Sequence, residues 1–451
     1  MKKRVVLYSS NSKRRSKDSN CVVFPKWNAL WDKLAEEYPA CDIYLVVQLN
    51  GRYYLDIYDG ELISPPDRIH LEILDMEAGL EEFVERITEL KPDVAIAMPG
   101  PVSGMDWNGL RDASIAEELK CRGIETICYP LRTAEICFDK WLTHQFLEEH
   151  GFNVAKAVYV HHELFFAGKN DPYSTGNVYQ EMVLQKVKRL PFPVIIKGTT
   201  GSASSGIVVS ASFEDAKTYL LSENNKEDLI VEEMLKGQEY GTEIHGCRGH
   251  YNVIPPIMKF TTDNEDVIDP LGLTTLKFGP MTGEKYHSDE FVSELTRMAE
   301  LLDLAGNNNL DMMLCDGKWY ILEINARWSG VTTLTACCED RSPYAVYLEQ
   351  YTGSKKDYTD LSNLRIACNF KMSGGTEQML EKLSKEDCVD SVIRYEIIRP
   401  DGTKYNFNDV IIGGFDSFGE MLKSLARLQK AYPDEISKDL VSAITQKLPM
   451  L

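Results

Sequence analysis

The segment NNLDMMLCDGKWYILEINAR, residues 308–327, contains two apolar runs on either side of Asp-Gly at 316–317. Asp-Gly between such runs is typical of a tight turn, so the sequence predicts two antiparallel strands. Glu323 and Asn325 are two residues apart on the second strand and share a face. With Asp311 on the first strand they would offer three oxygen ligands of the type that Mg²⁺ prefers.

The face on which Asp311 lies depends on the length of the hairpin loop. A two-residue turn pairs Asp311 with Leu322 and leaves Glu323 on the opposite face, because side chains alternate along a strand. A three-residue loop, 315–317, with a left-handed glycine at its end, makes Asp311 and Glu323 diagonal neighbours on one face. The metal hypothesis therefore predicts the three-residue loop.

An upstream segment, PFPVIIKGTTGSASSGIVVS at 191–210, places Lys197 at the end of an apolar run and follows it with glycines and small polar residues. One interpretation is a long hairpin turn. The other is a flap whose backbone N–H groups and hydroxyls close over phosphate oxygens, with Lys197 supplying charge. The spacing is not that of a P-loop. The candidate phosphate-binding residues of the flap are Ser202, Ser204, Ser205 and Gly206.

The next segment, LIVEEMLKGQEYGTEIHG at 229–246, could hold a nucleoside. A strand that leads into Glu232, Glu233 and Leu235 presents alternating C=O and N–H groups, which can meet the edge of an adenine. Glu239 could then accept hydrogen bonds from both ribose hydroxyls. The alternative is a strand and a turn whose glutamates are solvated.

One further basic residue belongs to the candidate site. Arg327 lies two residues beyond Asn325 and would project to the same side if the strand continues; a salt bridge at the rim is the alternative. Lys140 falls within a helix that apolar periodicity predicts over 133–150, with Gly151 as its C-terminal cap.

Strand-like and helix-like stretches alternate over about residues 1–130, which predicts an N-terminal parallel α/β domain. Residues 152–190 are polar and are predicted to be irregular. Residues 356–451 mix strands with an amphipathic helix and are predicted to form a C-terminal α+β unit.

The composition excludes several classes of protein. A net charge of −20 over 451 residues argues against a non-specific binder of nucleic-acid backbones, which needs clustered Lys and Arg. No segment approaches the length and apolar character of a membrane span. The 11 cysteines show no spacing typical of metal ligands and are expected to be reduced thiols. We therefore expect a cytoplasmic protein.

Taken in order, Lys140, Lys197 with its flap, VEEML…GQEY and LD…DGKWYILEINAR resemble the ATP-grasp superfamily over about residues 80–350. The resemblance implies an α/β (α+β grasp) fold with a two-part ATP-grasp domain at 131–355, whose mobile subdomain covers about 192–236.

The resemblance also implies ligand roles. By position, Lys140 and Lys197 would contact the α and β phosphates, and Lys259 and Lys277 are both available for the γ-phosphate. Arg327 would steady an acyl phosphate or tetrahedral intermediate, where Lys197 would also act. The residues implied to bind adenine and ribose are Glu232, Glu233, Leu235 and Glu239; those implied to hold two Mg²⁺ ions, with Mn²⁺ as an alternative, are Asp311, Glu323 and Asn325.

The chain is similar to carboxylate–amine ligases such as D-alanine–D-alanine ligases and L-amino-acid ligases. This implies that ATP activates a carboxylate as an acyl phosphate and that an amine, an amino acid or peptide-like molecule, then attacks, giving an amide, ADP and phosphate. The chain departs from D-alanine–D-alanine ligases at EINARWSGVTT and in its C-terminal unit. A carboxylase, a small-molecule kinase and a non-catalytic ATP-binding regulator are the alternatives.

The expected partners are a small-molecule carboxylate and an amine, with no nucleic acid and no membrane, and the resemblance implies a homodimer. The acid and the amine are not identified by the sequence. Segments 99–112 and 255–285 could form the acceptor pocket, where Asp106, Arg111 and Lys277 could bind charged ends of a substrate or lie in solvated loops.

Overall fold

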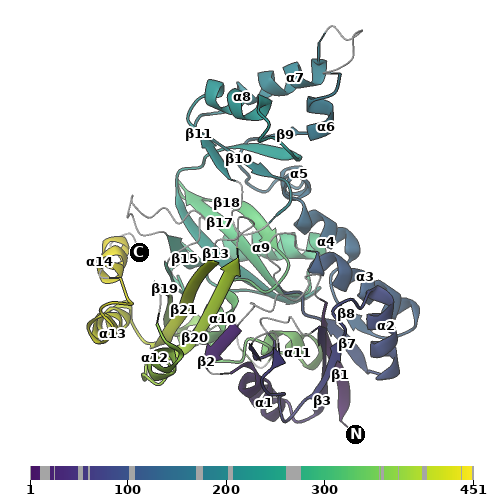
Figure 1. The fold of residues 1–451 in the computed structure, drawn as a ribbon, viewed down its shortest axis with the longest axis vertical. Helices are drawn as coiled ribbons and strands as arrows, with labels where there is room; N and C mark the ends of the chain where they lie inside the picture. The colour runs from purple at the N-terminus through teal and green to yellow at the C-terminus, as the bar shows by residue number, and fades with distance from the viewer. Residues whose placement is uncertain are drawn as a thin grey trace.

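The computed structural model of this mixed α/β protein describes residues 2–10, 21–24, 26–48, 54–58, 61–100, 107–168, 176–201, 207–260, 276–354, 356, 360–373, 375–398, 404–437 and 439–448. Its strands form three sheets, and one lobe projects from an elongated body (Figure 1). Among the described residues, no helix combines the length and the apolar character that crossing a membrane requires.

The N-terminal sheet has five parallel strands in the order β6-β3-β1-β7-β8. Its central strands are almost continuously buried and apolar, as expected of a parallel sheet that is covered on both faces. The predicted fold class, with a parallel N-terminal sheet, is confirmed. The elements of this region are β1 (Lys3–Ser9), α1 (Trp27–Glu37), β3 (Cys41–Gln48), β6 (His70–Leu74), α2 (Leu80–Glu89), β7 (Val94–Ala97), α3 (Asn108–Cys121) and β8 (Thr126–Ile127).

The projecting lobe is built on a four-stranded antiparallel sheet in the order β11-β10-β12-β9. It begins at β9, whereas the sequence placed the start of the mobile part near residue 192 and predicted irregular structure over 152–190. That prediction of irregular structure was wrong. The elements are β9 (Ala157–Val160), α6 (His162–Phe165), α7 (Val178–Val187), β10 (Val194–Gly198), β11 (Val208–Ser210), α8 (Phe213–Leu221) and β12 (Leu229–Glu233).

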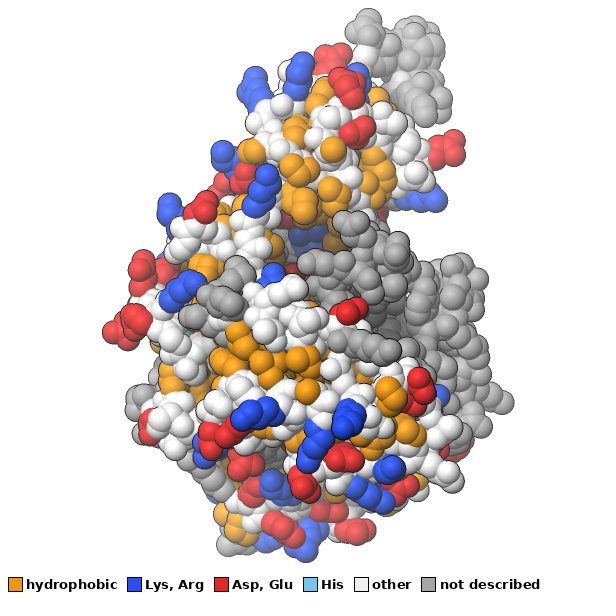
Figure 2. Space-filling model, turned by 90° about the vertical axis from the view of Figure 1, so that its left-hand side faces the viewer, with side chains coloured by type: hydrophobic (Ala, Val, Ile, Leu, Met, Phe, Trp, Pro, Cys, Tyr) orange, Lys and Arg blue, Asp and Glu red, His pale blue; other side chains and the backbone are white. Residues whose placement is uncertain are grey.

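Hydrophobic side chains gather on the face of the lobe that Figure 2 presents. Exposed hydrophobic residues of the lobe include Val178, Ile207 and Val209. The interior of the lobe is a separate apolar core that Val194, Ile196 and their neighbours form under the sheet. The lobe therefore has its own core.

The largest sheet has 12 strands and is antiparallel throughout. Its order is β18-β17-β13-β15-β16-β19-β21-β20-β2-β4-β5, and β14 pairs with β13. The strands are β2 (Cys21–Phe24), β4 (Ile57–Tyr58), β5 (Glu61–Leu62), β13 (Gln238–Cys247), β14 (His250–Val253), β15 (Ile257–Phe260), β16 (Leu276–Gly279), β17 (Gly306–Cys315), β18 (Lys318–Asn325), β19 (Ile366–Ser373), β20 (Val389–Ile398) and β21 (Lys404–Phe415).

This sheet crosses both of the domain boundaries expected near residues 130 and 355. Strands β19 to β21 continue it from β16, and β2 pairs with β20. The division into three domains therefore stays a prediction. The remaining helices are α4 (Leu131–Phe138), α5 (Lys140–Glu149), α9 (Asp289–Leu302), α10 (Thr332–Cys338), α11 (Ala345–Thr352), α12 (Glu377–Leu383), α13 (Phe418–Ala431) and α14 (Leu440–Lys447).

The two faces of the large sheet differ in chemistry. On one face, apolar residues such as Met258, Phe278 and Val410 pack with α12, α13 and α14 in one core. The alternate residues point to the other face, where polar and charged side chains gather. The candidate site lies on this second face.

The hairpin between β17 and β18 has a two-residue turn, because Cys315 pairs with Lys318. Asp316 and Gly317 both adopt positive φ angles, 48° and 76°, as a type I′ turn requires. The predicted three-residue loop was wrong. Asp-Gly is favourable for the tighter turn, since both residues tolerate left-handed backbone angles.

A β-bulge brings Asp311 and Glu323 to the same face of the sheet, as the three-residue loop was expected to do. Met312 pairs with Ile321, but Asp311 pairs with Glu323, so Leu322 is an extra residue on β18. Asp311 and Glu323 are consequently directly opposite each other on one face of the sheet.

Candidate active site

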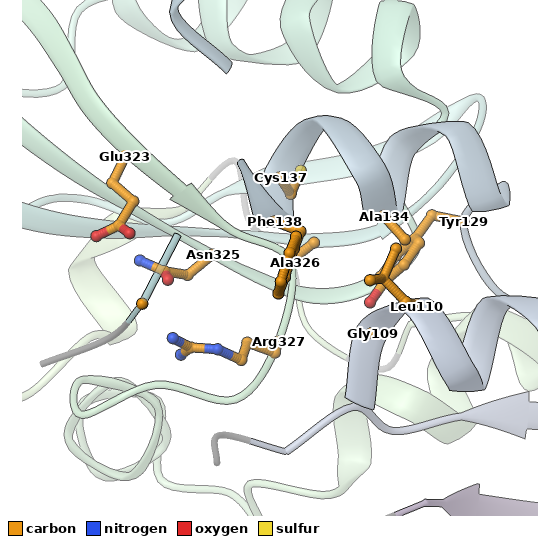
Figure 3. Close-up of a pocket in the computed structure, with 11 residues that line it drawn as sticks. Gly109, Leu110, Tyr129, Ala134, Cys137, Phe138, Glu323, Asn325, Ala326 and Arg327 are labelled. Carbon is orange, nitrogen blue, oxygen red and sulfur yellow. The ribbon is translucent and has the colours of Figure 1, made fainter. Parts of the chain in front are cut away.

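The structure brings Asp311, Glu323 and Asn325 together at one edge of the large sheet. Asp311 and Glu323 form a cross-strand pair, and Asn325 follows two residues along β18. Figure 3 shows Glu323, Asn325 and Arg327 in succession along the end of β18. The sequence predicted these residues as neighbours, and they are neighbours by way of the bulge.

The surroundings of Glu323 are strongly cationic. Burial alone would raise its pKa, but Lys140, Lys197 and Arg327 more than offset burial and lower the pKa below its ordinary value. The Nζ atom of Lys140 lies 3.3 Å from Oε1 of Glu323. Glu323 is therefore ionised at neutral pH and can act as a hard oxygen ligand.

The side chains of Asp311, Glu323 and Asn325 are chemically suited to bind a divalent cation. Two ionised carboxylates and an amide oxygen are the donors that Mg²⁺ takes in phosphate-binding sites. Among the described residues, no group of three or more His, Cys, Asp and Glu side chains is arranged to hold a metal ion. The candidate set therefore depends on Asn325 as its third member.

Lys140 is positioned by the start of α5. The helix predicted over 133–150 is in fact two helices, α4 and α5, because Asp139 is extended and interrupts the run. The Asp139 side chain accepts hydrogen bonds from the backbone N–H groups of Trp141 and Leu142, at 2.8 and 2.9 Å. Lys140 is thus the first residue of a capped helix.

Lys140 also holds the beginning of the flap. Its backbone N–H donates to the carbonyl of Thr199 at 2.7 Å, and its Nζ donates to the carbonyl of Gly201 at 2.9 Å. The four flap residues expected to contact phosphate, Ser202, Ser204, Ser205 and Gly206, lie outside the described residues. Their role stays a prediction.

Lys197 lies on β10 and forms a tight ion pair, with its Nζ 2.6 Å from Oε2 of Glu232. Both side chains are largely shielded from water. Because Lys197 also lowers the pKa of Glu323, it lies close to the candidate metal ligands. The structure therefore places Lys197 between the predicted adenine-binding strand and the predicted metal site.

Some backbone N–H groups at the end of β12 donate hydrogen bonds to the protein, and one does not. The N–H groups of Glu233 and Met234 donate to the carbonyls of Lys156 and Pro193, at 2.9 and 3.0 Å. Within the described part of the chain, the N–H of Leu235 donates to no protein group. The side chain of Glu233 accepts a hydrogen bond from the N–H of Lys156 at 2.9 Å. Leu235, unlike its two predecessors, has a donor available for a ligand.

Lys259 joins two of the predicted sites. Its Nζ lies 2.7 Å from Oε1 of Glu239 and 2.7 Å from Oδ1 of Asp311. Burial would lower its pKa, but Asp311 and Glu239 raise the pKa above the ordinary value. Lys277, the cross-strand neighbour of Lys259, instead donates to the carbonyl of Gly330 at 2.7 Å. The sequence could not distinguish the two lysines, and the structure gives them different partners.

Arg327 lies just beyond the end of β18. Its guanidinium donates to the carbonyl of Trp328 at 3.2 Å, and the N–H of Trp328 donates to the carbonyl of Pro99 at 3.0 Å. The chain therefore leaves the sheet here and contacts the segment that follows β7 of the N-terminal sheet. A side chain in this position faces the ligands of β18, as Figure 3 shows.

The turn that follows Arg327 is held by Glu243, a residue that the sequence analysis missed. The Thr332 hydroxyl donates to Oε1 of Glu243 at 2.6 Å, and the N–H of Ser329 donates to the same hydroxyl at 2.9 Å. Glu243 is fully buried, and Nε2 of His245 lies 3.0 Å from its other oxygen. The sequence did contain a signal for Glu243. It lies four residues after Glu239, and residues four apart on a strand share one face.

A small pocket adjoins these residues (Figure 3). Helices α3 and α4 provide an apolar wall, and Glu323, Asn325 and Arg327 provide a polar one. The segment expected to contribute, 99–112, does so through Gly109 and Leu110, whereas Asp106 lies outside the described residues. The lining residues are Gly109, Leu110, Tyr129, Ala134, Cys137, Phe138, Gly201, Glu323, Asn325, Ala326 and Arg327.

The family model for the ATP-grasp domain matches residues 137–331. Residues 137–331 form an ATP-grasp domain. The match begins just before Lys140 and ends just after Arg327, so it contains the residues predicted to bind ATP and metal. All the contacts described above for Lys140, Lys197, Lys259 and Asp311 belong to this ATP-grasp domain.

Curated relatives of this chain include a synthase and a ligase. A carbamoyl-phosphate synthase of Methanobrevibacter smithii is 24% identical over 275 residues, which is 60% of this chain and 68% of the relative. A D-alanine–D-alanine ligase of Buchnera aphidicola is 26% identical over 222 residues, which is 48% of this chain and 68% of the relative.

Solved structures share the fold over almost the whole chain. The L-amino acid ligase from Bacillus licheniformis has a TM-score of 0.60 at 15% identity and covers 95% of this chain and 97% of its own. The N5-carboxyaminoimidazole ribonucleotide synthetase from Thermus thermophilus has a TM-score of 0.61 at 14% identity, covering 94% and 98%. At these identities the similarity establishes the fold.

Proposed function

We propose that this protein is an ATP-dependent ligase that activates a carboxylate as an acyl phosphate and joins it to an amine, releasing ADP and phosphate. The observation that carries the proposal is the convergence of Lys140, Lys197, Lys259 and Arg327 on the Asp311–Glu323 pair. In a chain of net charge −20, such a concentration of cations, held among carboxylates, favours a ligand that combines anionic phosphates with a metal cation. The curated ligase relatives support the same reaction class.

ATP would lie between the lobe and the large sheet. The backbone of Glu232 to Leu235 would meet adenine, and Glu239 would meet the ribose hydroxyls. Lys140 and Lys197 would hold the α and β phosphates. Because Lys259 lies between Glu239 and Asp311, we assign to it, rather than to Lys277, the contact with the γ-phosphate.

Asp311, Glu323 and Asn325 would hold Mg²⁺, as two ions, with Mn²⁺ as an alternative. When bound, the metal would supply positive charge that neutralises the phosphates during transfer. The protein's own contribution is to keep Glu323 ionised and to hold it with Asp311 on one face of the sheet. The bulge at Leu322 provides the second of these conditions.

The acid would enter the pocket beside Arg327. There the guanidinium can bind the substrate carboxylate and later stabilise the oxyanion that forms when the amine attacks. The acyl phosphate would react with bulk water, so the flap after Lys197 would close over the site and exclude water during the reaction.

The first experiment is a product assay with ATP, Mg²⁺ and pooled amino acids and small carboxylic acids. We expect ADP and phosphate to form only when an acid and an amine are both present, with a product lighter than their sum by one water in mass spectrometry. Transfer of phosphate to an acceptor without condensation would instead indicate a kinase. Bicarbonate-dependent ADP formation would indicate a carboxylase.

Formation of AMP and pyrophosphate would contradict the proposal outright. ATP binding without turnover of any acid and amine would favour the regulator. We also propose that the chain is a homodimer and cytoplasmic, as the resemblance and composition imply. Light scattering of the purified protein measures its mass and tests the first point.

A further inference from the structure

The polar and charged face of the large sheet continues beyond Lys277 onto β19. Glu239, Lys259, Lys277 and Asn369 form an unbroken row of cross-strand pairs across β13, β15, β16 and β19. Directly paired residues of antiparallel strands point to the same side, so Asn369 shares a face with the candidate ATP site. The row thus leads from the ATP-grasp domain into the C-terminal strands.

Two charged residues continue this face on the C-terminal strands. Lys371 is two residues beyond Asn369 on β19 and pairs directly with Asp409 on β21. Because side chains alternate, Lys371 and Asp409 point to the same side as Asn369 and Lys277. Both are only partly exposed. An acidic and a basic residue are therefore held beside Lys277 by the regular geometry of the sheet.

Lys371 and Asp409 both interact electrostatically with Lys277. Burial lowers the pKa of Lys277 to about 8, Asp409 opposes this shift, and Lys371 and Lys259 add to it. Asp311 also acts on the same ammonium group and opposes the shift. These effects require Lys371 and Asp409 to lie near Lys277 in space as well as in register.

Asp409 has an unsatisfied acceptor. Its Oδ1 atom is shielded from solvent and accepts no hydrogen bond from any described group. A buried carboxylate oxygen without a donor is unfavourable in a folded protein and calls for an explanation. Val410 and Ile412 of β21 pack on the opposite face with α13, and Ile411, on the face of Asp409, packs with α10, but neither apolar cluster includes Asp409. A ligand with a positively charged donor would satisfy it.

Lys277 connects this cluster to Arg327. Its Nζ donates to the carbonyl of Gly330, in the turn that follows Arg327, and a Cβ atom on Gly330 would lie only 2.9 Å from that nitrogen. The turn and Lys277 are therefore packed closely together. A substrate held by Lys277 would lie next to the residue expected to stabilise the reacting carboxyl group.

We propose that Lys277, Lys371 and Asp409 form the subsite for the amine substrate, and that this substrate is an α-amino acid with its own free carboxylate. The two lysines bind that carboxylate, and Asp409 binds the ammonium group. The inference rests on the proposed ligase function and assigns the C-terminal strands to recognition of the attacking amine.

The test measures binding and turnover separately in the full-length protein. Each of the twenty L-amino acids is titrated calorimetrically in the presence of Mg²⁺ and a non-hydrolysable ATP analogue, followed by the carboxamide of the amino acid that binds best. We expect the amino acid to bind at least about tenfold more tightly than its carboxamide. Lys371→Gln and Asp409→Asn should each weaken its binding by at least about tenfold and leave the affinity for the ATP analogue unchanged.

Lys423→Gln is the matched control, because Lys423 is exposed on α13, which covers the opposite face of the sheet. It should change neither affinity. Wild-type amino-acid binding in both Lys371→Gln and Asp409→Asn, or equal binding of the carboxamide, would overturn the subsite, as would failure of all twenty amino acids to bind. Amino-acid binding that depends on Lys371 and Asp409, in a protein that never forms an amide, would support the subsite and refute only the ligase reaction.

Discussion

At the scale of single residues, charge decides what the candidate site can do. Glu323 is buried, yet its pKa is lowered, because three cations surround it. Lys259 is buried, yet its pKa is raised, because two carboxylates contact it. In each case the charged neighbours favour the charged form, so a ligand that replaces one ion pair must supply an equivalent charge.

Replacement of Glu323 by Gln should leave the fold intact and remove nearly all turnover. The amide has the same shape, so no cavity forms, but it lacks the charge that a metal ligand needs. We expect ADP formation to fall by about 100-fold or more. Thermal unfolding of the variant should stay within about 3 °C of the wild-type temperature.

The matched control for that variant is Glu223→Gln, an exposed residue of the lobe. It should be as active as the wild type. Wild-type turnover by Glu323→Gln would remove Glu323 from the metal-binding set.

A second residue, Asp112, predicts how stability depends on pH. It is fully buried on α3, and burial raises its pKa to about 7. Its Oδ1 accepts a hydrogen bond from the N–H of Ser10 at 2.9 Å, whereas Oδ2 has no partner among the described residues. The folded state therefore keeps a proton that the unfolded state loses near pH 4.

Because the folded protein binds this proton more tightly, the contribution of Asp112 to stability falls as the pH rises from about 4 to 7. Asp112→Asn removes that dependence and keeps the acceptor for Ser10. We expect the variant to exceed the wild type in free energy of unfolding at about pH 8 by a few kcal/mol, and to match it near pH 4, at about 1.4 kcal/mol per pKa unit. Urea unfolding at both pH values measures this, and parallel curves for the two proteins would refute it.

Some residue roles could be predicted from the sequence and others could not. The candidate oxygen ligands and Lys197 can be proposed from residue type and spacing. Lys259 and Lys277 cannot be separated in this way, since each lies in an apolar run at a similar distance from the motifs. Only the pairing of β13, β15 and β16 gives them different neighbours.

At the scale of elements, small departures from regular structure position the site. The turn at 316–317 is visible in the sequence, but the bulge is not, because Leu322 is an ordinary strand residue. The break between α4 and α5 is similarly hidden, because apolar residues continue at helical spacing across Asp139. Helix α7 was missed because Val178 and Met182 are exposed apolar residues, which obscure its amphipathic pattern.

The cap of α5 gives a prediction at this scale. Asp139→Ala removes both hydrogen bonds to the first turn of the helix and should destabilise the protein by about 1 kcal/mol. Because Lys140 is the first residue of that helix, we expect the KM for ATP to rise as well. Steady-state kinetics and thermal unfolding measure the two effects.

Asp139→Asn serves as the control, since Asn caps helices about as well as Asp. It should behave like the wild type. An Asp139→Ala protein with an unchanged KM for ATP would show that the cap does not position Lys140.

At the scale of the whole molecule, the large sheet joins segments from both ends of the chain. Patterns within the sequence predicted strands in the C-terminal unit, but not that β19 would extend the sheet from β16 or that β20 would pair with β2. The sequence of each strand predicts only a half-buried strand and does not indicate which other strand it pairs with.

The shared sheet predicts that the C-terminal unit cannot be removed. Residues 1–355 alone would leave the edge of β16 unpaired, and exposed strand edges promote aggregation. We expect this fragment to be insoluble when expressed alone and soluble when co-expressed with residues 356–451. Size-exclusion chromatography measures this, and a soluble, monomeric 1–355 fragment that binds ATP would contradict it.

The pairing of β2 with β20 also has a consequence for synthesis. Cys21–Phe24 leaves the ribosome early, but its partner at Val389–Ile398 is translated much later. At typical elongation rates the delay is roughly 20 to 75 s. Throughout that interval the nascent chain carries the apolar segment CVVF without β20. Correct folding therefore depends on protection of CVVF by a chaperone or by neighbouring residues until β20 has been translated.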